Sequence, residues 1–121
     1  MSEIDASIGG SPVTLSGLSY VDSGAAGGGS AGALADLFDG SSSTFWGFNT
    51  EPPRSLTIDM GSSTSIDTFG IRSSGSSFDS VSYGPGGFII LGSDDNATYD
   101  TLLTVTGQPI WGLAERRTFG L

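Results

Sequence analysis

The stretch SLTIDMGSSTSIDTFGIR, residues 55–72, decides the fold of this chain. Apolar side chains occupy every second position from 56 to 60, which is the period of a strand with one buried face and one polar face. Residues 61–63 (Gly-Ser-Ser) then predict a turn, and a second strand is predicted from 66 to 72. Two half-buried strands joined by a short turn indicate an antiparallel pair.

The rest of the chain repeats this pattern of short strands separated by turns. A turn is predicted at 93–96, because aspartate and asparagine side chains hydrogen-bond to nearby backbone groups. Residues 33–38 favour a helix of one or two turns, which ends at an Asp-Gly pair. Strands of this length and spacing predict an all-β fold, an antiparallel β-sandwich. Further strands are expected at 12–15, 18–21, 88–91 and 102–105, with a last one from 117.

The alternation also predicts the core of the sandwich. Residues 1–32 are interpreted as a flexible Gly/Ser-rich arm with short strands, because residues 24–32 consist of glycine, alanine and serine only. The sandwich domain is then expected over 33–121, in a chain long enough for one domain. Side chains expected to face its core are Leu56, Ile58, Met60, Phe69, Ile71, Phe88, Ile90 and Leu102.

Charge and composition exclude several classes of function. With 13 acidic and 4 basic residues the net charge is −9, so nucleic acids and anionic membrane surfaces are not expected as partners. Histidine and cysteine are absent, which removes the usual zinc sites, Ser–His and thiol nucleophiles, and disulfides. No apolar run is long enough to insert into a membrane, and residues 1–10 lack a signal-peptide pattern. The adjacent Asp94 and Asp95 point apart on a turn, so no enzyme is expected.

Three segments resemble one known family in their order and spacing. Residues 35–46 (ADLFDGSSSTFW) contain an Asp-Gly loop followed by a tryptophan. Residues 53–61 (PRSLTIDMG) are similar to a strand that ends in Ile-Asp-Leu-Gly, and residues 87–96 (GFIILGSDDN) to one that ends in Gly-Ser-Asp-Asp-Gly. Trp111 and residues 117–119 stand where that family commonly has a tryptophan and an arginine–aromatic strand. The chain therefore resembles the discoidin family, also called coagulation factor V/VIII type C domains, over about residues 33–121.

The resemblance implies a galactose-binding-like jelly roll that works as a glycan-binding or adhesion module. Many members hold a structural calcium at the Asp-Gly loop, which makes Asp39 a candidate metal ligand, with Glu115 as a substitute for the acid near the C-terminus that usually completes the site. The alternative is that Asp39 only caps its own turn. Members of the family usually continue for another strand or two, so the edge of this sheet is expected to be completed by another chain or by the N-terminal strands, unless the sequence is a fragment.

The candidate ligand-binding residues are three aromatic side chains and one arginine. Phe48, Phe78 and Tyr83 lie in predicted loops, where an aromatic face can stack on a sugar ring. Arg72 ends a predicted strand, where its guanidinium can donate paired hydrogen bonds to sugar hydroxyls or to a carboxylate. An ion pair at the rim is the alternative for Arg72, and a loop folded over the sheet edge is the alternative for Phe78 and Tyr83. Trp46 is expected to pack in the core.

Two classes of function remain open. The first is a structural or adhesion component of a virus (phage) particle, such as a decoration or tail protein, which contacts other protein subunits and host glycans at the virion surface. This class reconciles an extracellular type of fold with a chain that starts at methionine without a secretion signal. The second is a carbohydrate-binding or adhesion domain of a larger secreted or cell-surface protein. Similarity of fold does not decide between them.

Overall fold

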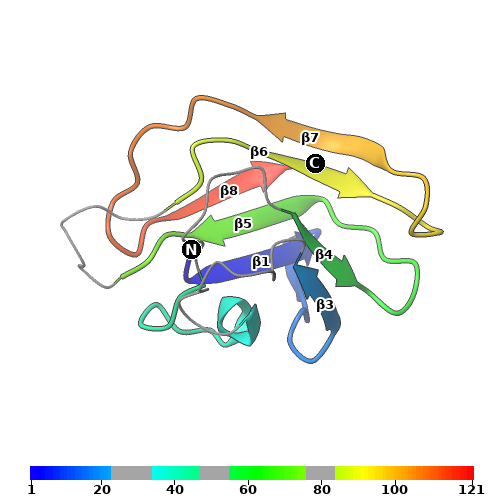
Figure 1. The fold of residues 1–121 in the computed structure, drawn as a ribbon, viewed down its shortest axis with the longest axis horizontal. Coiled ribbons are helices and arrows are strands. Elements are labelled where there is room, and N and C mark those ends of the chain that lie inside the picture. Colours follow the sequence, from blue (N-terminus) through cyan, green and yellow to red (C-terminus); the bar gives the residue numbers. More distant parts are fainter. Residues whose placement is uncertain (23–33, 47–54, 76–83) are drawn as a thin grey trace.

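The computed structural model describes residues 1–22, 34–46, 55–75 and 84–121, and it confirms an all-β, antiparallel sandwich (Figure 1). A five-residue 3₁₀ helix, η1 (Leu34–Phe38), lies where the sequence predicted one or two helical turns. Within the described ranges no helix is long and apolar enough to cross a membrane. The strands are β1 (Glu3–Ile8), β2 (Ser11–Val13), β3 (Ser19–Asp22), β4 (Leu56–Asp59), β5 (Thr68–Arg72), β6 (Phe88–Gly92), β7 (Asp100–Val105) and β8 (Arg116–Gly120).

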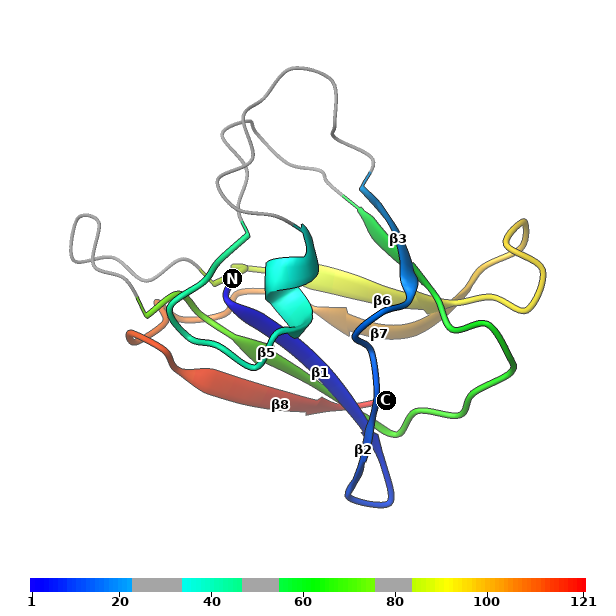
Figure 2. The same cartoon turned by 90° about the horizontal axis from the view of Figure 1, so that it is seen from below.

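The strands form two layers, which Figure 2 shows one above the other. One layer is a four-stranded sheet in the order β2-β1-β5-β8, in which each neighbouring pair is antiparallel. The other layer consists of two antiparallel pairs, β3–β4 and β6–β7. Phe88 of β6 meets Phe119 of β8 edge to face, with ring centroids 4.9 Å apart. This contact joins the two layers on the β8 side of the sandwich.

The hydrophobic core is centred between β1 and η1. Leu37 of the helix is fully buried, and Trp46 is only 3 % exposed. They pack with Ile4 and Ala6 of β1 and with Leu15, which are also buried. Trp46 is therefore a packing residue, in agreement with the sequence analysis, and its ring face is not available to a ligand.

The predicted core is confirmed at Ile71 and in part at six other positions, with one error. Ile71 is buried, whereas Leu102 is 48 % exposed. The prediction for Leu102 is wrong because the pairing of β6 and β7 is irregular there: Ile90 pairs with Leu103, but Leu91 pairs with Thr101. This bulge adds one residue to β7 and shifts its alternation, so that Leu103 takes the place beside Ile90. The other six predicted core residues are half-buried: Leu56, Ile58, Met60, Phe69, Phe88 and Ile90.

The first residues of the chain form a strand inside the sheet, where the sequence analysis expected an arm. β1 lies between β2 and β5, with Ile4 opposite Ile71 and Ala6 opposite Phe69. The sheet is therefore extended within the chain by its own N-terminal strands, which was one of the two expected ways of completing the edge. No strand was predicted at β1, although the apolar Ile4, Ala6 and Ile8 alternate with polar residues.

The other short strands of the N-terminal part were predicted. Those expected at 12–15 and 18–21 correspond to β2 and β3. β3 pairs with β4, and its Tyr20 stacks on Phe38 of η1 with ring centroids 4.5 Å apart. Residues 24–32 lie outside the described part of the chain, so their flexibility stays a prediction.

Candidate functional site

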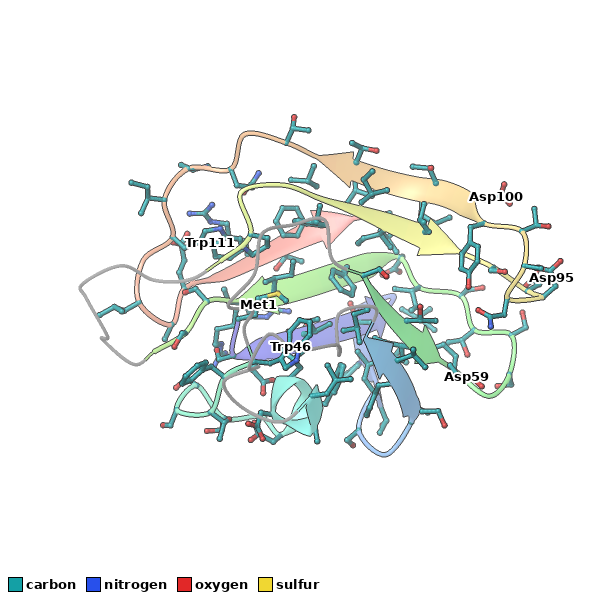
Figure 3. All side chains as sticks on the ribbon, viewed as in Figure 1. Met1, Trp46, Asp59, Asp95, Asp100 and Trp111 are labelled. Carbon is teal, nitrogen blue, oxygen red and sulfur yellow. The ribbon has the colours of Figure 1, made fainter. Side chains whose placement is uncertain are left out.

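One end of the sandwich collects charged side chains from three strands and a loop. β1 begins there, β5 ends there and β8 begins there, and the register places Glu3, Arg72 and Arg116 side by side across the sheet. Asp39, in the loop after η1, adjoins Glu3. We call Glu3, Asp39, Arg72 and Arg116 the charged end. Met1, which precedes β1, marks its position in Figure 3.

Arg72 is the arginine of the charged end that forms no ion pair within the described part of the chain. Its Nε is buried and has no hydrogen-bond partner among the residues that the structure describes. The neighbouring arginines are engaged, because Arg116 pairs with Asp5 (N–O distance 2.7 Å) and Arg117 with Glu115 (2.7 Å). A buried donor without a partner costs roughly 1–3 kcal/mol. Arg72 therefore has donor capacity that no described residue uses, while its guanidinium still attracts the Glu3 carboxylate, so a ligand contact and a rim ion pair both stay predictions.

Glu3 and Asp39 place two carboxyl groups next to each other. Oε1 of Glu3 accepts a hydrogen bond from the Gly40 N–H (2.7 Å). Oδ1 of Asp39 accepts one from the Ser41 N–H (2.8 Å), which is the expected turn-capping bond, and Oδ2 accepts one from the Thr44 hydroxyl (2.7 Å). Burial, and then the neighbouring Asp39, raise the pKa of Glu3, although the Gly40 N–H acts in the other direction. The Thr44 hydroxyl and the Ser41 N–H lower the pKa of Asp39.

The sequence analysis named Asp39 and Arg72 but missed Glu3. The structure brings the three together, because Glu3 faces Arg72 in the register of β1 and β5 and adjoins Asp39. The signal that could have found it is the alternating segment EIDASI at 3–8, which is typical of a strand with Glu3 on its polar face.

Of the aromatic residues named in the sequence analysis, the structure places Trp111 but does not describe the three candidates for sugar stacking. Trp111, near the C-terminus, is 4 % exposed and lies under the guanidinium of Arg117, whose carbon is 4.1 Å from the ring centre. Its indole N–H donates to the Pro85 carbonyl (3.0 Å), so this ring is a structural contact. Three residues proposed for sugar stacking lie outside the described ranges, and their roles stay predictions: Phe48, Phe78 and Tyr83.

Buried serines hold the backbone below the charged end. The Ser2 hydroxyl donates to the Ser73 carbonyl (2.7 Å). The Ser73 hydroxyl donates to the Gly112 carbonyl (2.6 Å) and accepts from the Glu115 N–H (3.0 Å). Both serines are fully buried, and these bonds satisfy their polar atoms. The segment that follows Arg72 is therefore fixed to β1 and to the loop before β8, which provides rigid support for a binding site.

A calcium ion at the Asp-Gly loop would be held by Asp39 and Glu3. Both offer carboxylate oxygens, the ligands that calcium prefers, and their adjoining like charges favour a cation between them. Glu115 is not placed for the role that the resemblance gave it, because its carboxylate binds Arg117 and the Gly112 N–H. In the ranges that the structure describes, no three acidic side chains are grouped so that they could hold a metal ion together.

The comparison with protein families agrees with this fold. A family described as a NedA-like, galactose-binding domain matches residues 36–120, well over half of the chain. The match confirms the resemblance to coagulation factor V/VIII type C domains. It begins after β1, so Glu3 lies outside the matched residues. Comparison with the curated proteins and with the solved structures gave no match.

Proposed function

We propose that this chain, which belongs to the NedA-like, galactose-binding domain family, is a carbohydrate-binding module whose ligand site consists of Arg72, Glu3 and Asp39 of the charged end. The observation that carries the proposal is the guanidinium of Arg72, which has no hydrogen-bond or ion-pair partner among the described residues and lies beside the carboxylate of Glu3. A sugar hydroxyl donates and accepts hydrogen bonds at the same time. It therefore suits a site in which a guanidinium donor stands next to carboxylate acceptors.

The arrangement suits two neighbouring hydroxyls of a galactose-type ring. Arg72 would donate to one or both of them, and the carboxylates of Glu3 and Asp39 would accept from the same hydroxyls. The apolar face of the ring needs an aromatic partner. We propose the three residues already predicted from the sequence for that role: Phe48, Phe78 and Tyr83.

The available chemistry supports binding without catalysis. The chain contains no histidine, cysteine or lysine, so carboxylates and tyrosines are its only candidate general bases. Asp95, one of the two adjacent acids, accepts hydrogen bonds from the N–H groups of Ala97 (2.9 Å) and Thr98 (2.8 Å). Those bonds fix its carboxylate as part of a turn.

Arg72→Gln tests the proposed sugar site. Wild-type binding is first located on a glycan array that includes galactose-terminated sugars and is then measured by calorimetry. A hydrogen bond to a charged group contributes about 1.5–3 kcal/mol, so the variant should bind roughly 10- to 100-fold more weakly. Arg116→Gln is the matched control, because it removes the same charge one strand away and should leave the affinity unchanged. Equal weakening in both variants, or no glycan binding by the wild type, would contradict the proposal.

A second candidate function is a structural component of a virus (phage) particle, such as a decoration or tail protein, located at the virion surface or outside the cell. The supporting observation is β7, which pairs with β6 on one side and with no other strand among the described residues. A free strand edge can pair with another subunit. Light scattering at increasing protein concentration tests this function. A defined multimer would support it. A monomer that binds glycans would contradict it and would support the carbohydrate-binding module.

A further inference from the structure

The β6–β7 pair exposes apolar side chains on the face that points away from the core. Ile89 is 60 % exposed and Leu91 is 51 % exposed, whereas Phe88 and Ile90, which alternate with them, are half-buried. Leu102, which is 48 % exposed, lies against Gly92 on the other side of the strand pair and is not part of this face. Apolar side chains that are grouped on one strand pair, rather than scattered singly, are typical of a contact surface.

The partner strand adds no charge to this face. Ile89 pairs with Thr104, and Leu91 pairs with Thr101, so the residues beside the apolar ones are threonines. We call Ile89, Leu91, Thr101 and Thr104 the β6–β7 face. An uncharged centre of this kind can be desolvated at low cost, as the core of a protein interface requires.

Acidic residues border the β6–β7 face at one end only. Asp94 and Asp95 lie in the turn between the two strands, and Asp100 begins β7; all three are exposed. Asp95 and Asp100 lie far from Met1 in Figure 3. The described arginines, at positions 72, 116 and 117, end β5 or begin β8 at the opposite end of the molecule. The negative charge at this border is therefore not compensated by the described residues.

We propose that the β6–β7 face is a docking surface for another protein, whose contact region has an apolar centre bordered on one side by lysine or arginine. The apolar centre would cover Ile89 and Leu91, and the basic border would meet Asp94, Asp95 and Asp100. A second copy of this chain does not fit as the partner, because it carries a net charge of −9 and would bring more acidic groups to the contact. This inference is independent of the sugar site, which lies at the other end of the strands.

The double variant Ile89→Ser/Leu91→Ser tests the surface. The probe is a short synthetic helical peptide with a leucine face and a lysine face, whose binding is followed by fluorescence anisotropy. We expect the wild type to bind it, with weaker binding at high salt, and the double variant to lose at least about tenfold in affinity. Ile110→Ser/Leu113→Ser is the control, because it removes two other exposed apolar side chains, which lie outside the β6–β7 face, and should bind like the wild type.

Two further measurements separate this surface from non-specific attraction to an acidic protein. A peptide in which serine replaces the leucines, and one in which glutamate replaces the lysines, should both bind much more weakly than the original. Unchanged melting temperatures show that both double variants stay folded, as expected for exposed positions. Equal binding by both double variants would overturn the proposal. A concentration-dependent dimer that Ile89→Ser/Leu91→Ser abolishes would also overturn it, because the face would then bind a second copy.

Discussion

Two neighbouring residues of β5, Ile71 and Arg72, show what alternation along a strand determines. It assigns Ile71 to the core and Arg72 to the other face, and in the structure Ile71 is buried and Arg72 lies beside Glu3. Alternation does not determine depth. Ile58 follows the same pattern but is half-buried, since β4 belongs to a two-stranded pair, whereas β5 has a neighbour on each side.

The difference in depth predicts different costs for the same substitution. Ile71→Ala should lower the free energy of unfolding by about 2–5 kcal/mol, the usual range when a buried aliphatic side chain is truncated. Ile58→Ala should cost less, because part of that side chain is already in water in the folded protein. Urea unfolding followed by circular dichroism measures both values. A loss at Ile58 equal to that at Ile71 would contradict the burial described for β4.

Only part of the charged end could be predicted from the sequence, because two of its residues stand in local patterns and a third depends on strand pairing. Arg72 and Asp39 each stand in a local pattern, the end of a strand and an Asp-Gly turn, which the sequence displays directly. Glu3 acquires its role through a neighbour that is distant in sequence. Its position opposite Arg72 depends on the register of β1 against β5, and no local pattern specifies that register.

At the scale of the elements, β1 is the strand that was not predicted, and its local signal is weaker than those of the central strands. β4, β5 and β6 have runs of branched or aromatic side chains, and η1 is followed by the Asp39-Gly40 stop. β1 contains alanine and serine among its six residues, which weakens the strand signal, and it precedes a glycine-rich segment. The bulge in β7 arises from its pairing with β6, which sequence alone does not reveal.

The loop after η1 is the element in which calcium binding can be tested. If the ion binds the native protein, removing it with a chelator should lower the melting temperature of the wild type. Asp39→Asn should abolish that difference. Asp59→Asn is the control, because Asp59 also accepts a turn bond from a backbone N–H two residues ahead, that of Gly61 (2.8 Å), and its variant should still respond to the chelator. If the chelator does not change the wild-type melting curve, Asp39 only caps its own turn and does not bind calcium.

At the scale of the whole molecule, the sandwich depends on strands that lie outside the family match. The match begins at residue 36, whereas β1 lies between β2 and β5 and supplies Ile4 and Ala6 to the core. The composition of residues 1–32 favoured an arm with short strands, attached to a sandwich domain over 33–121. Strand pairing instead makes residues 1–22 part of the sandwich, because β5 has β1 on one side and β8 on the other.

A chain reduced to residues 33–121 is therefore expected not to fold. It would lack β1, so the backbone groups of β5 would lose their partners on one side, and Leu37 and Trp46 would lose the apolar side chains packed against them. Thermal unfolding followed by circular dichroism should show a cooperative transition for the full chain and none for the shortened one. Adding a synthetic peptide of residues 1–22 should restore the transition, because the peptide supplies the missing strands in trans. The contrary result would be a shortened chain that melts cooperatively without the peptide, at a temperature close to that of the full chain. It would show that β1 is not needed for folding and that residues 1–32 are an arm.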